Sequence, residues 1–122
     1  MSDPRTVIER WTGVWNEGRL EWIPDLMADP CLRHHPGSAE KFTVVDNVER
    51  VRAGRKRFPG VAFENVVLTA DGEYVTSVYT MRWNGADPAG AVVEAAGIEV
   101  FRIVDGRITE TWNVEPGEGP WR

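Results

Sequence analysis

The chain changes its hydrophobic period at Pro59 and Gly60, and this change constrains the fold more than any other feature. Before it, apolar residues recur every three or four positions, as they do on one face of a helix. After it, the run 61–85 is rich in β-formers, and Asp-Gly pairs at 71–72 and 105–106 mark hairpin turns. Helices followed by antiparallel strands predict an α+β fold, with N-terminal helices packed on a curved, mostly antiparallel sheet.

The first predicted helix has sequence signals at both ends. Asp3 can cap it, and Pro4 fits its first position, where a missing N–H costs nothing. Gly18 is placed to end it, because glycine adopts the left-handed conformation that closes many helices. A second, short helix is predicted over 20–27.

A strand and a third helix complete the first half of the chain. The run CLRHH (31–35) predicts a short strand that Pro36 stops. Asp46 is placed to cap a helix within 44–58. The basic run 52–57 is interpreted as the solvated end of this helix rather than as an anion site.

Composition narrows the class of protein. The 122 residues predict one domain, 1–122, long enough for a hydrophobic core. The net charge of −5 argues against nucleic-acid binding, and no apolar run approaches the ~20 residues of a membrane span. The N-terminal residues lack the apolar region of a secretory signal. The single cysteine, Cys31, is predicted to be a buried thiol, which fits a cytoplasmic protein with no nucleic-acid or membrane partner.

Glu99 is the most informative single residue. Its period-two partners on the strand are apolar or glycine: Val93, Ala95, Gly97, Phe101 and Ile103. Apolar surroundings disfavour the charged form, so the pKa of Glu99 is expected to rise. A neutral carboxylic acid can donate a hydrogen bond to a developing oxyanion. The alternatives are a side chain turned to solvent, or one paired with an arginine such as Arg102.

The register of the last hairpin decides what Glu99 faces. A two-residue loop at 105–106 is expected to set Glu99 opposite Trp112. A three-residue loop with a glycine bulge is expected to set it opposite Thr111, with Asn113 and Glu115 on the same face.

The second register has a consequence for assembly. It leaves Ile108, Trp112 and Val114 on the reverse face of the sheet. A sheet with apolar groups on both faces predicts that the reverse face is covered, most simply by a second subunit. We therefore predict a homodimer through the outer sheet face.

His34 and His35 are the only histidines. Adjacent residues on a strand point to opposite faces, so both cannot serve one site equally. Period alone leaves open which of them faces the interior. No Cys/His spacing resembles a metal-ligand set, and no glycine fingerprint for nucleotides is present, so neither a metal nor a cofactor is predicted.

The chain resembles the nuclear-transport-factor-2-like superfamily, which has a cone-shaped α+β fold. Within it, the chain is similar to the SnoaL-like polyketide cyclases and the ketosteroid isomerases. The resemblance runs from VIERWTGVWNEGRLEWIPDLMADP (7–30) to GIEVFRIVDGRITETWNVE (97–115), and FRIVDGRITETW (101–112) is its most family-like part.

The likeness to ketosteroid isomerases implies one assignment of roles. Their general base, an Asp before a Pro at the end of the first strand, matches His35 in HHPG. Their protonated Asp matches Glu99, and their helix Tyr matches Trp11. Histidine can still act as a base, since its ordinary pKa is near 6.5. An indole N–H can still donate a hydrogen bond.

The likeness to SnoaL-like proteins implies a different assignment. Their His-Asn-Pro after the first strand places His34 on the family histidine. Their Trp-Asp pair on the last strand matches Trp112 and Asn113. Because Asn113 is an amide, it cannot accept a proton as that Asp does, and Glu115 is an alternative acceptor two residues on.

The resemblance implies a cofactor-independent acid/base enzyme acting on a small apolar carbonyl compound in an enclosed pocket, as an isomerase, a cyclase or a dehydratase (lyase). The predicted catalytic groups are a histidine base, with His35 favoured over His34, Glu99 as donor and Asn113 orienting the substrate. The residues predicted to contact the substrate are Trp11, Trp15, Tyr79, Met81, Trp83, Phe101 and Glu115.

Two alternatives are retained. The first is a non-catalytic module of the same fold that binds a small molecule or dimerises. The second is epoxide hydrolysis by an activated water, which requires an Asp/Arg/Asp set that the sequence does not display.

Overall fold

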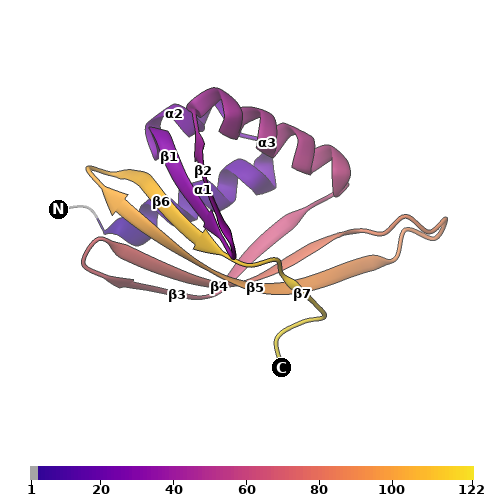
Figure 1. The fold of residues 1–122 in the computed structure, drawn as a ribbon. Helices are drawn as coiled ribbons and strands as arrows, with labels where there is room; N and C mark the ends of the chain where they lie inside the picture. Colours follow the sequence, from indigo (N-terminus) through magenta and orange to yellow (C-terminus); the bar gives the residue numbers. More distant parts are fainter. Residues whose placement is uncertain (1–2) are drawn as a thin grey trace.

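The fold is a layer of helices on one face of a single curved sheet (Figure 1). The structure is a computed structural model and describes residues 3–122. The helical segments are α1 (Pro4–Glu17), η1 (Leu20–Trp22), α2 (Ile23–Leu26) and α3 (Val44–Arg57). The strands are β1 (Met27–His35), β2 (Ser38–Phe42), β3 (Ala62–Asp71), β4 (Tyr74–Asn84), β5 (Val92–Val104), β6 (Arg107–Asn113) and β7 (Gly117–Glu118).

The strands run in the order β2-β1-β6-β5-β4-β3, and β7 pairs with β5. β1 and β6 pair in parallel, and the neighbouring pairs on either side are antiparallel. The prediction of an α+β fold with a mostly antiparallel sheet is confirmed. Met1 and Ser2, which begin the stretch predicted not to be a secretory signal, lie outside the described residues.

The ends of α1 are those predicted from the sequence. The side chain of Asp3 accepts a hydrogen bond from the Arg5 backbone N–H at 3.0 Å, and Pro4 occupies the first turn. Gly18 closes the helix at a φ of 70°, and its N–H donates to the Val14 carbonyl.

The N-terminus of α3 corrects the prediction. Thr43 caps the helix, and Asp46, the third residue of the helix, completes a capping box with it. The Thr43 hydroxyl accepts from the Asp46 backbone N–H at 3.1 Å, and the Asp46 carboxylate accepts from the Thr43 N–H at 2.9 Å. Both residues are good caps, and the box uses them together.

Two strands differ from expectation. β1 begins at Met27 rather than at residue 31, and β2 was predicted as no strand at all. β2 lies at the sheet edge and is exposed along nearly its whole length, so its sequence carries no apolar alternation.

The last hairpin has neither of the two expected registers. Asp105 and Gly106, with φ of 51° and 75°, form a two-residue loop. Thr109 is then an extra residue between two ladder partners, a β-bulge, and its hydroxyl donates to the Arg102 carbonyl at 3.3 Å.

The bulge places Glu99 opposite Asn113. The two-residue loop sets Ile108 opposite Ile103, and its side chain is fully buried in the core, which corrects its expected place on the reverse face. Trp112 stays on the outer face, where it stacks on His34.

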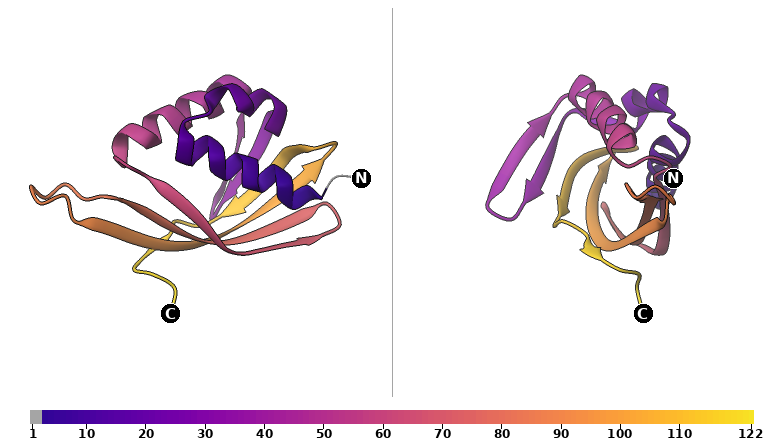
Figure 2. Two further views of the ribbon diagram at one scale, coloured as in Figure 1. Left: turned by 180° about the vertical axis from the view of Figure 1, so that it is seen from behind. Right: turned by 90° about the vertical axis from the view of Figure 1, so that its right-hand side faces the viewer.

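The helices cover the concave face of the sheet, and the C-terminal tail lies on the other side (Figures 1 and 2). The main core lies between α1, α2 and the ends of β4, β5 and β6, with Ile8, Ile23, Val75, Phe101 and Ile108 at its centre. A smaller cluster of Val61, Tyr79 and Met81 lies further along the sheet. The space beside this smaller cluster holds the candidate site.

Candidate functional site

A cavity of about 180 Å³ lies between the helices and the concave face of the sheet. Its wall is mostly aromatic and aliphatic, with a few polar side chains. The lining residues are Ile8, Trp11, Thr12, Trp15, Arg50, Phe63, Asn65, Ser77, Tyr79, Met81, Glu99, Phe101, Asn113 and Pro116. An apolar hollow with a few convergent polar groups is the usual form of a small-molecule site.

A larger cleft of about 580 Å³ adjoins the cavity. The two share four lining residues: Trp15, Arg50, Met81 and Pro116. Trp83 and Glu115 line this cleft rather than the cavity itself. A ligand that fills the cavity can therefore extend past Arg50 into the cleft.

Three neighbouring strands place polar side chains in one row across the cavity floor. Glu99 on β5 pairs directly with Ser77 on β4 and with Asn113 on β6. The Ser77 hydroxyl donates to the Asn65 amide oxygen at 2.6 Å. The Asn65 amide donates to the Thr12 hydroxyl at 3.0 Å, so the row is tied to α1.

Glu99 is held in surroundings that oppose its charge. Only 13% of its side chain is exposed. Burial raises the pKa of Glu99 above its ordinary value, against the smaller lowering effects of Arg33, Arg50 and, least, His35. The raised pKa expected from the apolar strand is therefore confirmed.

The ion-pair partner of Glu99 is Arg33, not Arg102. The Arg33 side chain is 1% exposed, and its Nη2 lies 3.7 Å from Glu99 Oε2, beyond hydrogen-bond distance. Arg102 instead binds Glu73 and approaches Glu110.

Arg50 reaches the cavity from α3. Its guanidinium lies 5.6 Å from the Trp15 ring centre, as a cation–π contact. Burial, and then the nearby charge of Arg33, lowers the pKa of Arg50 to about 10, so the side chain still carries its charge at neutral pH.

Tyr79 and Trp15 are seated against glycines. A Cβ on Gly97 would lie 2.5 Å from the Tyr79 ring, and one on Gly54 would lie 2.7 Å from the Trp15 ring. Only glycine allows these close approaches. Burial, and next the charge of Glu99, raises the pKa of Tyr79 to about 12, so its phenol remains a hydrogen-bond donor.

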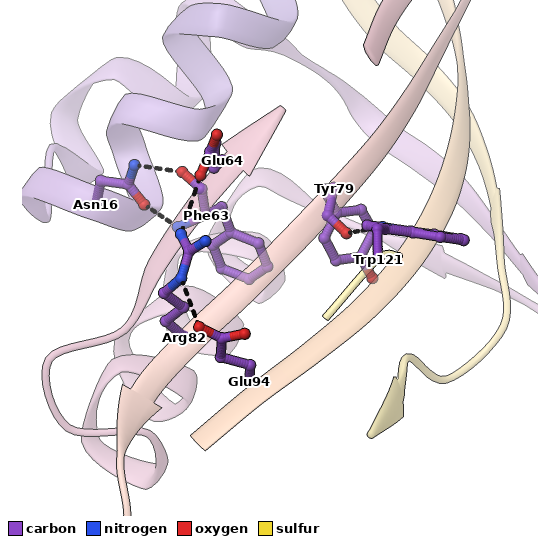
Figure 3. A network of polar contacts seen from close by, with 7 residues as sticks. All are labelled: Asn16, Phe63, Glu64, Tyr79, Arg82, Glu94 and Trp121. Carbon is purple, nitrogen blue, oxygen red and sulfur yellow. Dashed lines mark hydrogen bonds and ion pairs between the residues drawn. The ribbon is translucent and has the colours of Figure 1, made fainter. Parts of the chain in front are cut away.

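Hydrogen bonds outside the cavity hold its wall in place (Figure 3). The Asn16 side chain donates to the Phe63 carbonyl at 2.9 Å and accepts from the Phe63 N–H at 2.7 Å, which joins α1 to β3. Trp121 donates from its indole to the Tyr79 carbonyl at 2.8 Å, which fastens the C-terminal tail to β4.

The two histidines lie outside the cavity wall. His34 is on the outer face, where its Nε2 donates to Glu110 Oε2 at 2.5 Å and its ring stacks on Trp112. His35 is exposed at the end of β1. Both line a shallow hollow with Pro36 and Ile98.

The structure brings most of the sequence-predicted site residues together. Those that line the cavity are Trp11, Trp15, Tyr79, Met81, Glu99, Phe101 and Asn113. Sequence reasoning missed Arg33 and Arg50. Arg33 shares a strand face with Cys31, which is buried as predicted, with a pKa raised by burial to about 11. Its position on the same strand face as Cys31 was the one feature of the sequence that indicated a buried Arg33.

Residues 3–122 contain neither a membrane-spanning helix nor a metal-binding cluster. No helix among them is long and apolar enough to cross a membrane. No group of three or more His, Cys, Asp or Glu side chains there is arranged to hold a metal ion.

Comparison with known proteins gives one family. The family described as SnoaL-like polyketide cyclase matches residues 5–116. No curated protein gives a significant match.

Solved structures share the fold over nearly the whole chain. A candidate polyketide cyclase from Acidithiobacillus ferrooxidans is 25% identical, with a TM-score of 0.79 over 93% of this chain and 88% of that one. IdmH, a candidate polyketide cyclase from Streptomyces antibioticus, is 21% identical, with a TM-score of 0.81 over 92% and 91%. AclR, a candidate hydroxylase from Streptomyces galilaeus, is 22% identical, with a TM-score of 0.74 over 91% and 77%.

Proposed function

The chain belongs to the SnoaL-like polyketide cyclase family, and from this premise we propose that it is a cofactor-independent acid/base enzyme acting on a small carbonyl compound. The reaction is of the cyclase, isomerase or dehydratase type. All three begin when a proton is removed from a carbon next to a carbonyl group. They need a base and a donor that stabilises the enolate, enclosed in a largely apolar cavity.

The single observation that carries this proposal is Glu99 in the cavity wall, buried and with a raised pKa. A carboxyl group whose pKa lies nearer to neutrality is a more effective proton-transfer group than an ordinary one. Glu99 is therefore assigned as the group that takes the substrate proton and returns it. This reverses the roles predicted from the sequence, where Glu99 is the donor and a histidine the base.

The proposed step moves one proton. Ionised Glu99 takes the proton from the α-carbon, the C–H electron pair forms a C=C bond to the carbonyl carbon, and the π pair of the carbonyl moves to its oxygen to give an enolate. The Tyr79 phenol and the Asn113 amide, which line the cavity, are the donors proposed for that oxygen. In a cyclase the enolate carbon then attacks a second carbonyl, whose oxygen takes the proton from Glu99; in an isomerase Glu99 returns the proton to a carbon.

The histidines receive different places in this scheme. His35 is proposed to exchange the proton of Glu99 with solvent, supported by its exposure and its electrostatic effect on Glu99. His34 hydrogen-bonds Glu110 on the other face of the sheet, and no contact supports a catalytic role for it.

The test is exchange of the α-protons of 2-indanone for deuterium, followed by NMR. Loss of a positioned acid/base group costs roughly 10² to 10⁴ in rate. We expect Glu99→Gln to reduce protein-dependent exchange by that amount, and the matched outer-face variant Glu110→Gln to keep it. Equal exchange by wild type and Glu99→Gln would sink the assignment.

A non-catalytic ligand-binding module is the second candidate function. It is favoured by Asn113, an amide where the SnoaL-like pattern has an acid, and by the absence of both histidines from the cavity wall. Binding of 2-indanone with no protein-dependent exchange identifies this function instead.

A homodimer through the outer sheet face is also proposed. Val78 pairs with Val67 and Ile98, and Val100 pairs with Trp112, so apolar side chains adjoin across β3 to β6. Val67 and Ile98 are 46% and 45% exposed. Sedimentation that shows a monomer at all concentrations would contradict this interface.

A further inference from the structure

We propose that the ligand of this cavity is an anion, and that Arg50, with Arg33 behind it, binds a carboxylate carried by a one- or two-ring molecule. The anion is the substrate of the proposed enzyme only if the proposed function is correct. The physical basis of the anion site is independent of any reaction.

The first support is the balance of charge inside the protein. The chain has a net charge of −5, yet the groups buried around the cavity have the opposite balance. Arg33, which is 1% exposed, and the half-buried Arg50 contribute two positive charges, and Glu99 contributes at most one negative charge. The neutral Tyr79 phenol adds none. At least one positive charge therefore lies in a largely apolar enclosure, where an uncompensated charge is costly.

The second support is the number of buried polar atoms that lack a partner. In residues 3–122, seven buried side-chain nitrogen or oxygen atoms have no hydrogen-bond partner. Six of them belong to five residues around this site: Arg33, Arg50, Glu99, Thr111 and Asn113. Three of the six are guanidinium nitrogens, which can only donate. Native proteins rarely leave such atoms unpaired. Of the two arginines, only Arg50 lines the cavity, so it is the one whose guanidinium an acceptor on a ligand can approach.

Glu99 does not supply that acceptor. The closest approach of Arg33 to Glu99 is 3.7 Å, and Glu99 Oε2 is itself among the unpaired atoms. The two guanidiniums are instead held by aromatic rings, Arg33 over Phe42 at 5.7 Å and Arg50 over Trp15 at 5.6 Å. Stacking of this kind fixes a guanidinium without using its N–H groups, and for Arg50, which lines the cavity, it leaves them free for a ligand.

The volume and lining of the cavity limit the size and the apolar part of the ligand. An engineered protein cavity of about 150 Å³ accepts benzene, and this cavity measures about 180 Å³. Trp11, Trp15 and Phe101 offer apolar surface for a ring. Arg50 lines both the cavity and the cleft, so it lies where a ring in the cavity can carry a carboxylate. Arg33 does not line either hollow and is therefore a positioning residue.

The test is calorimetric titration at neutral pH with two probes of one shape, indane-2-carboxylate and indane-2-carboxamide. A hydrogen bond to a charged group is worth about 1.5 to 3 kcal/mol, or about tenfold or more in affinity. We expect wild type to bind the carboxylate at least about tenfold more tightly than the amide. Arg50→Met should abolish this preference and leave amide binding nearly unchanged.

The matched control is Arg52→Met, which removes the same charge from an exposed position on α3 and should keep the preference. Arg50→Gln is the second variant if Arg50→Met does not fold. Equal binding of both probes by wild type, or equal loss in Arg52→Met, would overturn the proposal.

The outcome is separable from that of the proposed function. A protein that prefers the carboxylate but exchanges no α-proton of 2-indanone contradicts the enzyme and retains the anion site. A protein that exchanges protons and shows no preference contradicts the anion site alone.

Discussion

The two faces of the sheet carry similar charged residues but differ in how these side chains are hydrogen-bonded and exposed to water. On the outer face, Glu110 accepts from His34 at 2.5 Å and lies 3.8 Å from Arg102, which in turn binds Glu73 at 2.7 Å. On the concave face, Glu99 faces Arg33 at 3.7 Å with no hydrogen bond between them. The outer charges are paired and in reach of water. The inner charges form a buried ion pair whose members share no hydrogen bond.

This comparison predicts unequal costs for removing the two acids. Glu99→Leu leaves Arg33 and Arg50 buried with no counter-charge, and breaking a buried pair in this way costs roughly 3 to 5 kcal/mol of unfolding free energy. Glu110→Leu removes a partly exposed partner and should cost about 1 kcal/mol or less. Urea unfolding at neutral pH measures both, and equal costs would break the contrast.

A second variant asks whether the inner pair stabilises the fold at all. Replacing a buried ion pair by apolar side chains is often neutral or stabilising by roughly 1 to 4 kcal/mol. We expect the double variant Arg33→Met/Glu99→Leu to regain, in the same unfolding experiment, part of the stability that Glu99→Leu loses, because only Arg50 then lacks a counter-charge. A double variant no more stable than Glu99→Leu would contradict this account of the inner pair.

The pH dependence of stability gives the smallest effect. Because the folded pKa of Glu99 is raised, the folded state holds its proton more tightly than the unfolded chain does. Wild type should therefore lose stability relative to Glu99→Gln as the pH rises above about 4, by at most about 1.4 kcal/mol per pH unit. Unfolding free energies of both proteins across pH 4 to 8 measure this, and a constant difference would contradict a raised pKa.

The parts of the molecule set by local chemistry were predictable from the sequence. The ends of α1 follow from Asp3, Pro4 and Gly18, which act on their own helix. Glu99 was identifiable because a single acid among apolar residues on one face of a strand is uncommon. The edge strand β2 was missed because exposed strands need no apolar pattern.

The parts set by tertiary contacts were not predictable. Arg33 and Arg50 act on the charge of Glu99 from β1 and α3, which are distant in the chain from β5. Period two placed the histidines on opposite faces, but which face closes the cavity depends on packing by the helices. The register of β6 depended on Thr109, and the turn residues carry no sign of that bulge.

The bulge at Thr109 inserts one residue into the alternation of side chains along β6. Residues before and after it therefore alternate in opposite phase, so Ile108, Thr111 and Asn113 all point to the concave side. Without the extra residue, the phase that now carries Thr111 and Asn113 inward would carry Glu110 and Trp112 instead. A strand shorter by one residue would therefore place the side chain of Trp112 in the space that the cavity now occupies.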